Sequence, residues 1–376
     1  MENLSHSLTG LALAKTQLGE RIPFGVATLV VAANLPDLDI LVSLEGPLHY
    51  LHYHRGITHS LIGTVVMGLV LGIVVFMTRR FSRVPGARFI DCLWLTQLGA
   101  LTHPLLDYTN SYGLRPFLPF SEARYFGDLV FIVDPYLWLI LGSTTFLASR
   151  WGRWGRTFWM VGLGAVLAVT LLFLTTVPSL LVYLVILLVG LGVTIWVRLR
   201  YGVLGPGTAR AGLALMVGYW LLLGGLHQLA LRHAGVWAGE FAARDTSALA
   251  ALPRPADPIR WDIFLESRHQ LHTATIDSLN GRIENHIGID HNRDSPEVKA
   301  ALETCPGRVL AHFGRFVRYQ VEETDSGRDV VFRDLRFGRG NGSGFGTYRI
   351  RLKSDLSGLR STEPCPDPES YLPSHP

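Results

Sequence analysis

The sequence is poor in charged residues. Asp, Glu, Lys and Arg make up 17% of its 376 residues, where a soluble domain has about 25%, and this deficit excludes a single soluble globule. The deficit is confined to residues 1–231, which hold 25 of the 64 charged side chains, whereas residues 232–376 hold 39. The sequence therefore predicts a membrane-like first part and a soluble second part.

An excess of positive charge is also lacking. The formal net charge of +4 is the sum of +5 in residues 1–231 and −1 in the remainder. The basic residues of the first part lie between apolar segments, which is the pattern of a membrane protein with its positive loops inside. We expect no nucleic-acid partner and a lipid bilayer as the surroundings, and the sequence indicates no oligomeric state.

Cysteines are few, and a secretion signal is missing. Cys92 lies in an apolar segment, and Cys305 and Cys365 lie in the charged part. A disulfide between the last two in an oxidising compartment and two free thiols are both compatible with the sequence. Glu2 follows Met1 where a signal peptide has basic residues, so we expect no cleaved signal.

Long apolar runs are abundant in the first part. About 20 apolar residues cross a bilayer, and five runs approach this length: residues 61–78, 129–148, 158–177, 180–197 and 211–231. Three shorter runs (4–18, 22–35 and 89–106) carry ionisable residues at or near their ends. We predict a mainly α, polytopic membrane domain over residues 1–232, with its motifs in residues 1–135.

Three clusters of arginine fix the expected topology. They lie at 79–88, 150–156 and 198–210, and by the positive-inside rule they face the cytoplasm. Residues 54–60, residues 107–128 and the whole chain after Arg232 are then extracytoplasmic.

The charged part predicts a smaller, soluble domain. Residues 233–260, with Pro253, Pro255 and Pro258, are typical of a linker. Over 261–360 we expect a β-rich (α+β) domain, because strand-like alternation occurs at 261–265, 270–276, 315–322, 329–337 and 346–353. Ser295 is placed to cap a short helix at 296–303. The proline-rich residues 361–376 predict a disordered tail.

Four clusters of histidine and aspartate stand out in the first third of the chain. Histidine nitrogens and aspartate oxygens are ligands for zinc, and also for manganese or iron. The candidate metal ligands are His6, Asp37, Asp39, His54, His59, His103 and Asp107. In the expected topology all four clusters reach the same face of the membrane. Seven ligands exceed the three or four that one zinc takes, so they suit one or two divalent ions.

The spacing within each cluster makes local predictions. His103 and Asp107 are four residues apart and share a helix face, although Pro104 either kinks that helix or starts a new one. Asp37 and Asp39 would lie on one side of an extended chain, after a helix stopped by Pro36. A tight loop at Gly56 would turn His54 and His59 inward, and Ser60 would cap a helix that begins at Leu61.

Other polar residues of the first part have weaker patterns. Arg55, Asn110 and Asp134 are candidate helpers of a reaction, with Asp134 expected to pair with Arg115, Arg124 or a metal. His49 and His52 are either additional ligands or, as we expect, loop residues near the mouth of the site, and His227 is expected in helix packing. In the second part, we expect His269, His272, His286 and His291 at solvated positions.

These motifs resemble the YdjM-like family of predicted inner-membrane, metal-dependent hydrolases. The resemblance rests on HSLTG at 6–10, NLPDLD at 34–39, HRGITHS at 54–60 and THPLLDYTNSYG at 102–113, and it covers about residues 1–150. It implies that the seven candidate ligands are metal-site positions. It also implies a distant relation to zinc-dependent phospholipase C.

Two classes of function remain open from the sequence. The first is a membrane-bound hydrolase that cleaves a phosphoester or ester bond of a lipid-like substrate by metal-activated water at the outer membrane face, with zinc as the preferred metal. The second is a non-enzymatic protein in which the metal is structural, sensed or transported. Transport is disfavoured because the apolar runs after Asp134 carry no carboxylates.

Overall fold

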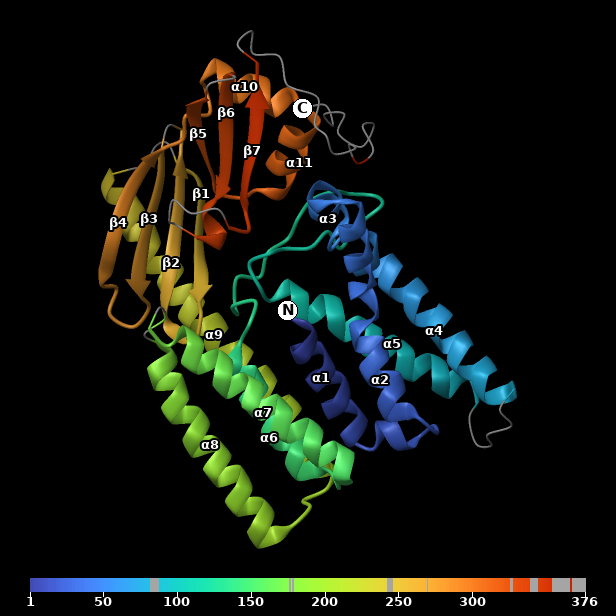
Figure 1. Ribbon diagram of the computed structural model, residues 1–376. Helices are drawn as coiled ribbons and strands as arrows, with labels where there is room; N and C mark the ends of the chain where they lie inside the picture. Colours follow the sequence, from blue (N-terminus) through green and yellow to red (C-terminus); the bar gives the residue numbers. More distant parts are fainter. Residues whose placement is uncertain are drawn as a thin grey trace. The chain divides into compact units, whose positions relative to one another are not determined.

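The computed structural model describes residues 1–81, 88–175, 177, 179–241, 246–268, 270–324, 327–338, 344–353 and 366 (Figure 1). The chain divides into two compact units. The first unit comprises residues 1–38, 55–227 and 253–259, and the second comprises residues 39–54, 228–252 and 260–376. The predicted combination of a helical membrane domain and a β-rich C-terminal domain is confirmed.

The first unit is mainly helical. Its elements are α1 (Asn3–Lys15), η1 (Leu18–Glu20), α2 (Gly25–Asn34), the start of η2 (Leu35–Glu45), η3 (Ile57–His59), α4 (Leu61–Phe81), α5 (Phe89–Tyr108), α6 (Pro135–Ala148), α7 (Arg153–Phe173), α8 (Ser179–Tyr201) and most of α9 (Pro206–Phe241). Within the described residues, four helical stretches are long and apolar enough to cross a membrane: Gly25–Glu45, Leu61–Phe81, Ser179–Tyr201 and Pro206–Gly239.

Helix ends follow the capping residues that the sequence supplies. The hydroxyl of Ser60 accepts a hydrogen bond of 3.0 Å from the amide of Gly63, which confirms Ser60 as the cap of α4. The carboxylate of Asp134 accepts from the amides of Tyr136 and Leu137 and so starts α6 at Pro135. The expected span 129–148 is therefore wrong in its first six residues, because this cap shortens the helix to 14 residues.

Helices α1, α2 and α5 pack closely against one another (Figure 1). Two glycines permit this approach. A Cβ atom at Gly10 would lie 2.8 Å from the carbonyl oxygen of Leu29, and one at Gly99 would lie 2.6 Å from Cβ of Ala32. Each glycine lies four residues from a histidine of its own helix, so the close packing fixes the backbone next to His6 and His103.

The second unit contains two antiparallel sheets. One has the order β1-β2-β3-β4 and the other β5-β6-β7. The strands are β1 (Thr246–Arg254), β2 (Asp257–Ser267), β3 (Gln270–Asp277), β4 (Ile283–Asp290), β5 (Val317–Thr324), β6 (Gly327–Asp334) and β7 (Thr347–Leu352), with helices α3 (Pro47–Tyr53), α10 (Pro296–Glu303) and α11 (Cys305–Phe313). Buried apolar side chains of the first sheet, such as Phe264 of β2 and Leu271 of β3, pack with Phe316 and Leu335 in a core cluster.

Most predicted elements of the second part are confirmed, including α10 with its Ser295 cap. The stretch 233–260, which we expected to be a linker, instead holds the end of α9, all of β1 and the start of β2. Pro253 is tolerated because β1 is an edge strand, Pro255 lies in the turn before β2, and Pro258 precedes the part of β2 that pairs with β3. The predicted tail, apart from Pro366, lies outside the described residues, and so does Cys365, for which a disulfide with Cys305 and a free thiol were both left open.

Candidate metal centre

Four side chains of the first unit converge at one point. They are Asp37 from η2, His59 from the end of η3, and His103 and Asp107 from α5, and one ligand atom of each lies within 4.8 Å of all the others. His59, His103 and Asp107 are fully buried. Helix α5 continues through Pro104, so the predicted shared face of His103 and Asp107 is present.

The spacing of the ligand atoms matches one metal ion. Nε2 of His103 lies 3.0 Å from Nε2 of His59, 3.3 Å from Oδ1 of Asp37 and 3.6 Å from Oδ2 of Asp107. Nε2 of His59 lies 3.4 Å from Oδ1 of Asp37 and 3.3 Å from Oδ2 of Asp107. Ligands that surround zinc tetrahedrally at about 2.0–2.1 Å are about 3.3 Å apart. The residues therefore fit a tetrahedral divalent metal.

The two histidines are oriented by partners on their other ring nitrogens. Nδ1 of His103 lies 2.7 Å from the carbonyl oxygen of Ala33, the last turn of α2. Nδ1 of His59 lies 3.0 Å from the hydroxyl of Thr58. Because a carbonyl oxygen only accepts, His103 donates from Nδ1 and carries its lone pair on Nε2, which is the tautomer a metal requires. The hydroxyl of Thr58 can either donate or accept, so it orients the ring of His59 without fixing its tautomer.

His6 adds a further donor to the cluster. Its ring stacks on that of His103, with centroids 3.7 Å apart and planes inclined by 11°. Its Nε2 lies 3.4 Å from Oδ1 of Asp107, and neither ring nitrogen has a hydrogen-bond partner among the described residues. Such a fully buried, unsatisfied imidazole is costly unless a ligand completes it. The α-amino group of Met1 also contacts Oδ1 of Asp107.

Arg55 secures Asp107 from the other side. Its Nε lies 3.0 Å from Oδ2 of Asp107, and its Nη1 donates a 2.9 Å hydrogen bond to the side-chain oxygen of Asn110. The guanidinium lies 4.6 Å from the ring centre of Tyr112. Arg55 itself has a positive φ of 54°, so the left-handed residue of this loop is Arg55, next to the Gly56 that we expected to make the turn.

Asp39 and His54, two further predicted ligands, belong to the second unit and pair with each other. Oδ1 of Asp39 lies 3.0 Å from Nδ1 of His54. The expectation that Asp37 and Asp39 share one side of an extended chain is wrong, because they lie in the 3₁₀ helix η2. At three residues per turn, positions i and i+2 point in different directions. A ligand role for Asp39 and His54 stays a prediction.

The remaining polar candidates of the first part lie at a helix cap or are buried on a helix. Asp134 caps α6 and accepts a 3.0 Å hydrogen bond from the hydroxyl of Tyr219, in place of the expected arginine partners. His49 and His52 are buried on α3, which corrects their expected loop position.

The histidines of the second part are only partly as expected. His291 is buried, against the expectation of a solvated position, and its Nε2 lies 3.5 Å from Glu266. Nδ1 of His272 lies 3.3 Å from Nε2 of His286. His269 lies outside the described residues.

Comparison with known proteins finds a family match for about the first half of the chain. Residues 1–181 match the family described as YdjM inner membrane protein. The uncharacterized protein YfhP of Bacillus subtilis (strain 168) is 29% identical over 115 residues, which are 30% of this chain and 33% of that protein. The match thus spans about a third of that relative. No solved structure matches the chain. With its spans and its convergent motif residues, the segment 1–181 belongs to the YdjM inner membrane protein family.

Proposed function

We propose that this protein is a metal-dependent hydrolase of the inner membrane that cleaves a phosphoester or ester bond of a lipid-like substrate. The observation that carries the proposal is the convergence of Asp37, His59, His103 and Asp107, with the buried His6 as a further donor beside Asp107. Ionisable residues at membrane depth are costly and are retained chiefly where they function.

Zinc is the metal that best suits two imidazoles and two carboxylates at this spacing. When bound, such an ion polarises the oxygen under attack and lowers the pKa of water at the site. His59 and His103 would hold the ion through their Nε2 atoms, because Thr58 and Ala33 contact their Nδ1 atoms. Asp37 supplies Oδ1, and Asp107 supplies Oδ2.

Asp107 is suited to link two sites. Its Oδ2 faces His59, His103 and Arg55, whereas its Oδ1 faces His6. His6 is therefore placed either to contribute Nε2 to a second ion or to exchange a proton with substrate at that atom. Arg55 and Asn110 hold Asp107 in this orientation and keep a positive charge beside the position an anionic phosphoryl group would take.

The test uses the purified full-length protein with its metal content measured. Fluorescent or radiolabelled phospholipids are offered with and without chelator, and Asp37→Asn and His103→Ala serve as matched variants. The proposal requires cleavage that disappears with chelator and in both variants. Stoichiometric metal without cleavage of any tested phospholipid or ester would overturn it.

A structural metal is the second candidate function. Four protein ligands can close a zinc site completely, as structural sites do. This alternative requires that removing the metal lower the thermal stability of the protein while no ester is cleaved.

We also propose that the C-terminal domain is extracytoplasmic, on the basis of the arginine-rich loops. Protease added to intact spheroplasts should digest that domain, and its protection would place it in the cytoplasm.

A further inference from the structure

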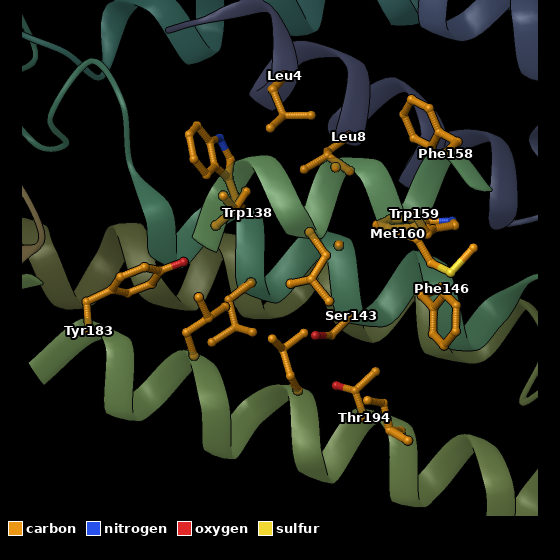
Figure 2. Close-up of a pocket in the computed structure, with 18 residues that line it drawn as sticks. Leu4, Leu8, Trp138, Ser143, Phe146, Phe158, Trp159, Met160, Tyr183 and Thr194 are labelled. Atoms are coloured by element: carbon orange, nitrogen blue, oxygen red, sulfur yellow. The ribbon is translucent and has the colours of Figure 1, made fainter. Parts of the chain in front are cut away.

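The first unit contains a second site-like feature, an apolar cavity of about 370 Å³ lined by α1, α6, α7 and α8 (Figure 2). This volume lies within the range of small-molecule sites. Nearly all of the atoms that line it are apolar, and all its lining residues belong to the first unit.

The cavity is long and narrow. On α8 its lining residues include Tyr183, Leu187, Leu191 and Thr194, which recur every three or four residues and so form one face of the helix. At 1.5 Å per residue, this face extends over about 17 Å. Opposite it, α6 contributes Trp138, Gly142 and Phe146 at the same spacing. An elongated apolar slot suits an extended hydrocarbon chain.

Glycines keep the slot open. A Cβ atom at Gly162 would meet no atom within 4 Å, and the nearest atom to a Cβ at Gly142 belongs to Trp159 at 3.5 Å. Larger side chains at these positions would fill the space that the cavity occupies.

One end of the slot carries a polar group that lacks a partner. Tyr183 is fully buried, and its hydroxyl has no hydrogen-bond partner within the described parts of the chain. Figure 2 shows this hydroxyl directed toward the α6 residues that line the cavity. Because an unsatisfied buried hydroxyl is unfavourable, the occupant of the slot should carry an acceptor at this end.

Helix α1 connects this end of the slot with the metal residues. The indole of Trp138 donates hydrogen bonds of 2.7 Å to Glu2 and 3.2 Å to Ser5. Leu4 and Leu8 of α1 line the cavity, whereas His6 between them stacks on His103. One short helix therefore contacts both the slot and the metal centre.

We propose that this slot binds one acyl chain of a membrane glycerophospholipid, whose ester carbonyl accepts a hydrogen bond from the Tyr183 hydroxyl. A bilayer supplies such chains, and the ester carbonyl is the acceptor that lies at the head of the chain. Binding of the lipid stands on the cavity alone. That this lipid is also the substrate rests on the proposed function.

The test places the full-length protein in nanodiscs of phosphatidylethanolamine that contain a small fraction carrying a diazirine on one acyl chain. After illumination, mass spectrometry locates the label. We expect label on the cavity-lining residues of α6, α7 and α8. Gly162→Leu should reduce it at least fivefold, whereas Gly164→Leu should leave it unchanged, because Gly164 lies on the same helix, is equally open and does not line the cavity.

The carbonyl contact is tested with Tyr183→Phe, a mild change that keeps the ring packed against Tyr136. This variant should lower labelling by the ester-linked probe about fivefold, the size of one neutral hydrogen bond. Labelling by an ether-linked analogue, which lacks the carbonyl, should be unaffected. An equal loss of labelling with both probes would show that Tyr183 does not donate a hydrogen bond to the ester carbonyl.

Three outcomes overturn the proposal as a whole: label spread evenly over the exposed face of α8, label insensitive to Gly162→Leu, or a free diazirine fatty acid that labels the slot in preference to the phospholipid. The Asp37→Asn variant separates this proposal from hydrolysis, since it should keep the label while losing cleavage. Label without any hydrolysis in the parent protein would contradict only the proposed function.

Discussion

Nδ1 of His103 lies 2.7 Å from the carbonyl oxygen of Ala33. A carbonyl oxygen only accepts, so the ring donates from Nδ1 and turns the lone pair of Nε2 toward His59, Asp37 and Asp107. The last turn of α2 thus selects the ligating tautomer before any metal arrives. The ligating form of His103 on α5 therefore depends on the packing of α2 against α5.

The first prediction concerns the metal ligands. His59→Ala and His103→Ala should each weaken metal binding by about 100-fold or more, because loss of a mere supporting partner already costs about 10–100-fold. His49→Ala, a buried histidine on α3, is the matched control and should keep full metal content. Metal is quantified by mass spectrometry after dialysis against a graded chelator series. Equal retention by all three variants would show that these histidines hold no ion.

The second prediction concerns the contact between α2 and α5. Gly99→Leu should force these helices apart, since even a Cβ atom would lie 2.6 Å from Ala32. We expect a loss of about 1–3 kcal/mol in stability, typical of overpacking, together with reduced metal content, because His103 is one turn away. Gly218→Leu on α9, where a Cβ meets no atom within 4 Å, should change neither. Thermal unfolding and metal analysis report the two effects, and a Gly99→Leu protein that matches the control would refute this prediction.

The third prediction separates capping from catalysis at Asp134. Asp134→Ala should lower stability by about 1 kcal/mol or more, as the loss of an N-cap does, since it also removes the acceptor for Tyr219. Asp134→Asn keeps the capping oxygen and should retain both stability and any hydrolytic activity. A folded Asp134→Asn protein without activity would instead give Asp134 a part in the reaction.

The fourth prediction concerns pH and the sheet β5-β6-β7. Arg351 donates hydrogen bonds of 2.7 and 3.0 Å to the carboxylate of Asp329, and this guanidinium holds the pKa of Asp329 below its usual value. A lowered folded-state pKa stabilises the protein fully above the unfolded pKa, about 3.9. That stabilisation disappears as the pH falls through the folded pKa.

Hydrogen exchange of β6 and β7, corrected for intrinsic rates, should therefore accelerate below about pH 4 in the parent protein. Asp329→Asn should remove this acid-dependent component. Glu323→Gln, at an exposed position of β5, should preserve it. An unchanged pH profile in Asp329→Asn would mean that the pair contributes no stability.

Local rules predicted much of this structure because their causes are local. Ser60 caps α4 since its hydroxyl reaches the amide three residues ahead, and His103 and Asp107 meet since one helical turn separates them. Asp37 and His59 were also predicted as metal ligands, because each belongs to a recognisable motif. The contacts of Ala33 and Thr58 were not, because a backbone carbonyl and a lone hydroxyl leave no pattern in the sequence.

The failures have equally specific causes. Pro36 ended α2 as expected, but the chain continued as the 3₁₀ helix η2, and this separates Asp37 from Asp39. Prolines at 253–258 suggested a linker because composition does not reveal that β1 is an edge strand. Long-range pairing decides such cases, and a single sequence does not display it.

Helix α1 has 13 residues, two leucines against the apolar slot and one histidine against the metal residues. Any displacement of this helix alters both surroundings at once. Filling of the slot by an acyl chain and the precision with which His6 is held are therefore thermodynamically linked. A protein depleted of lipid should therefore bind its metal less tightly than one in a bilayer.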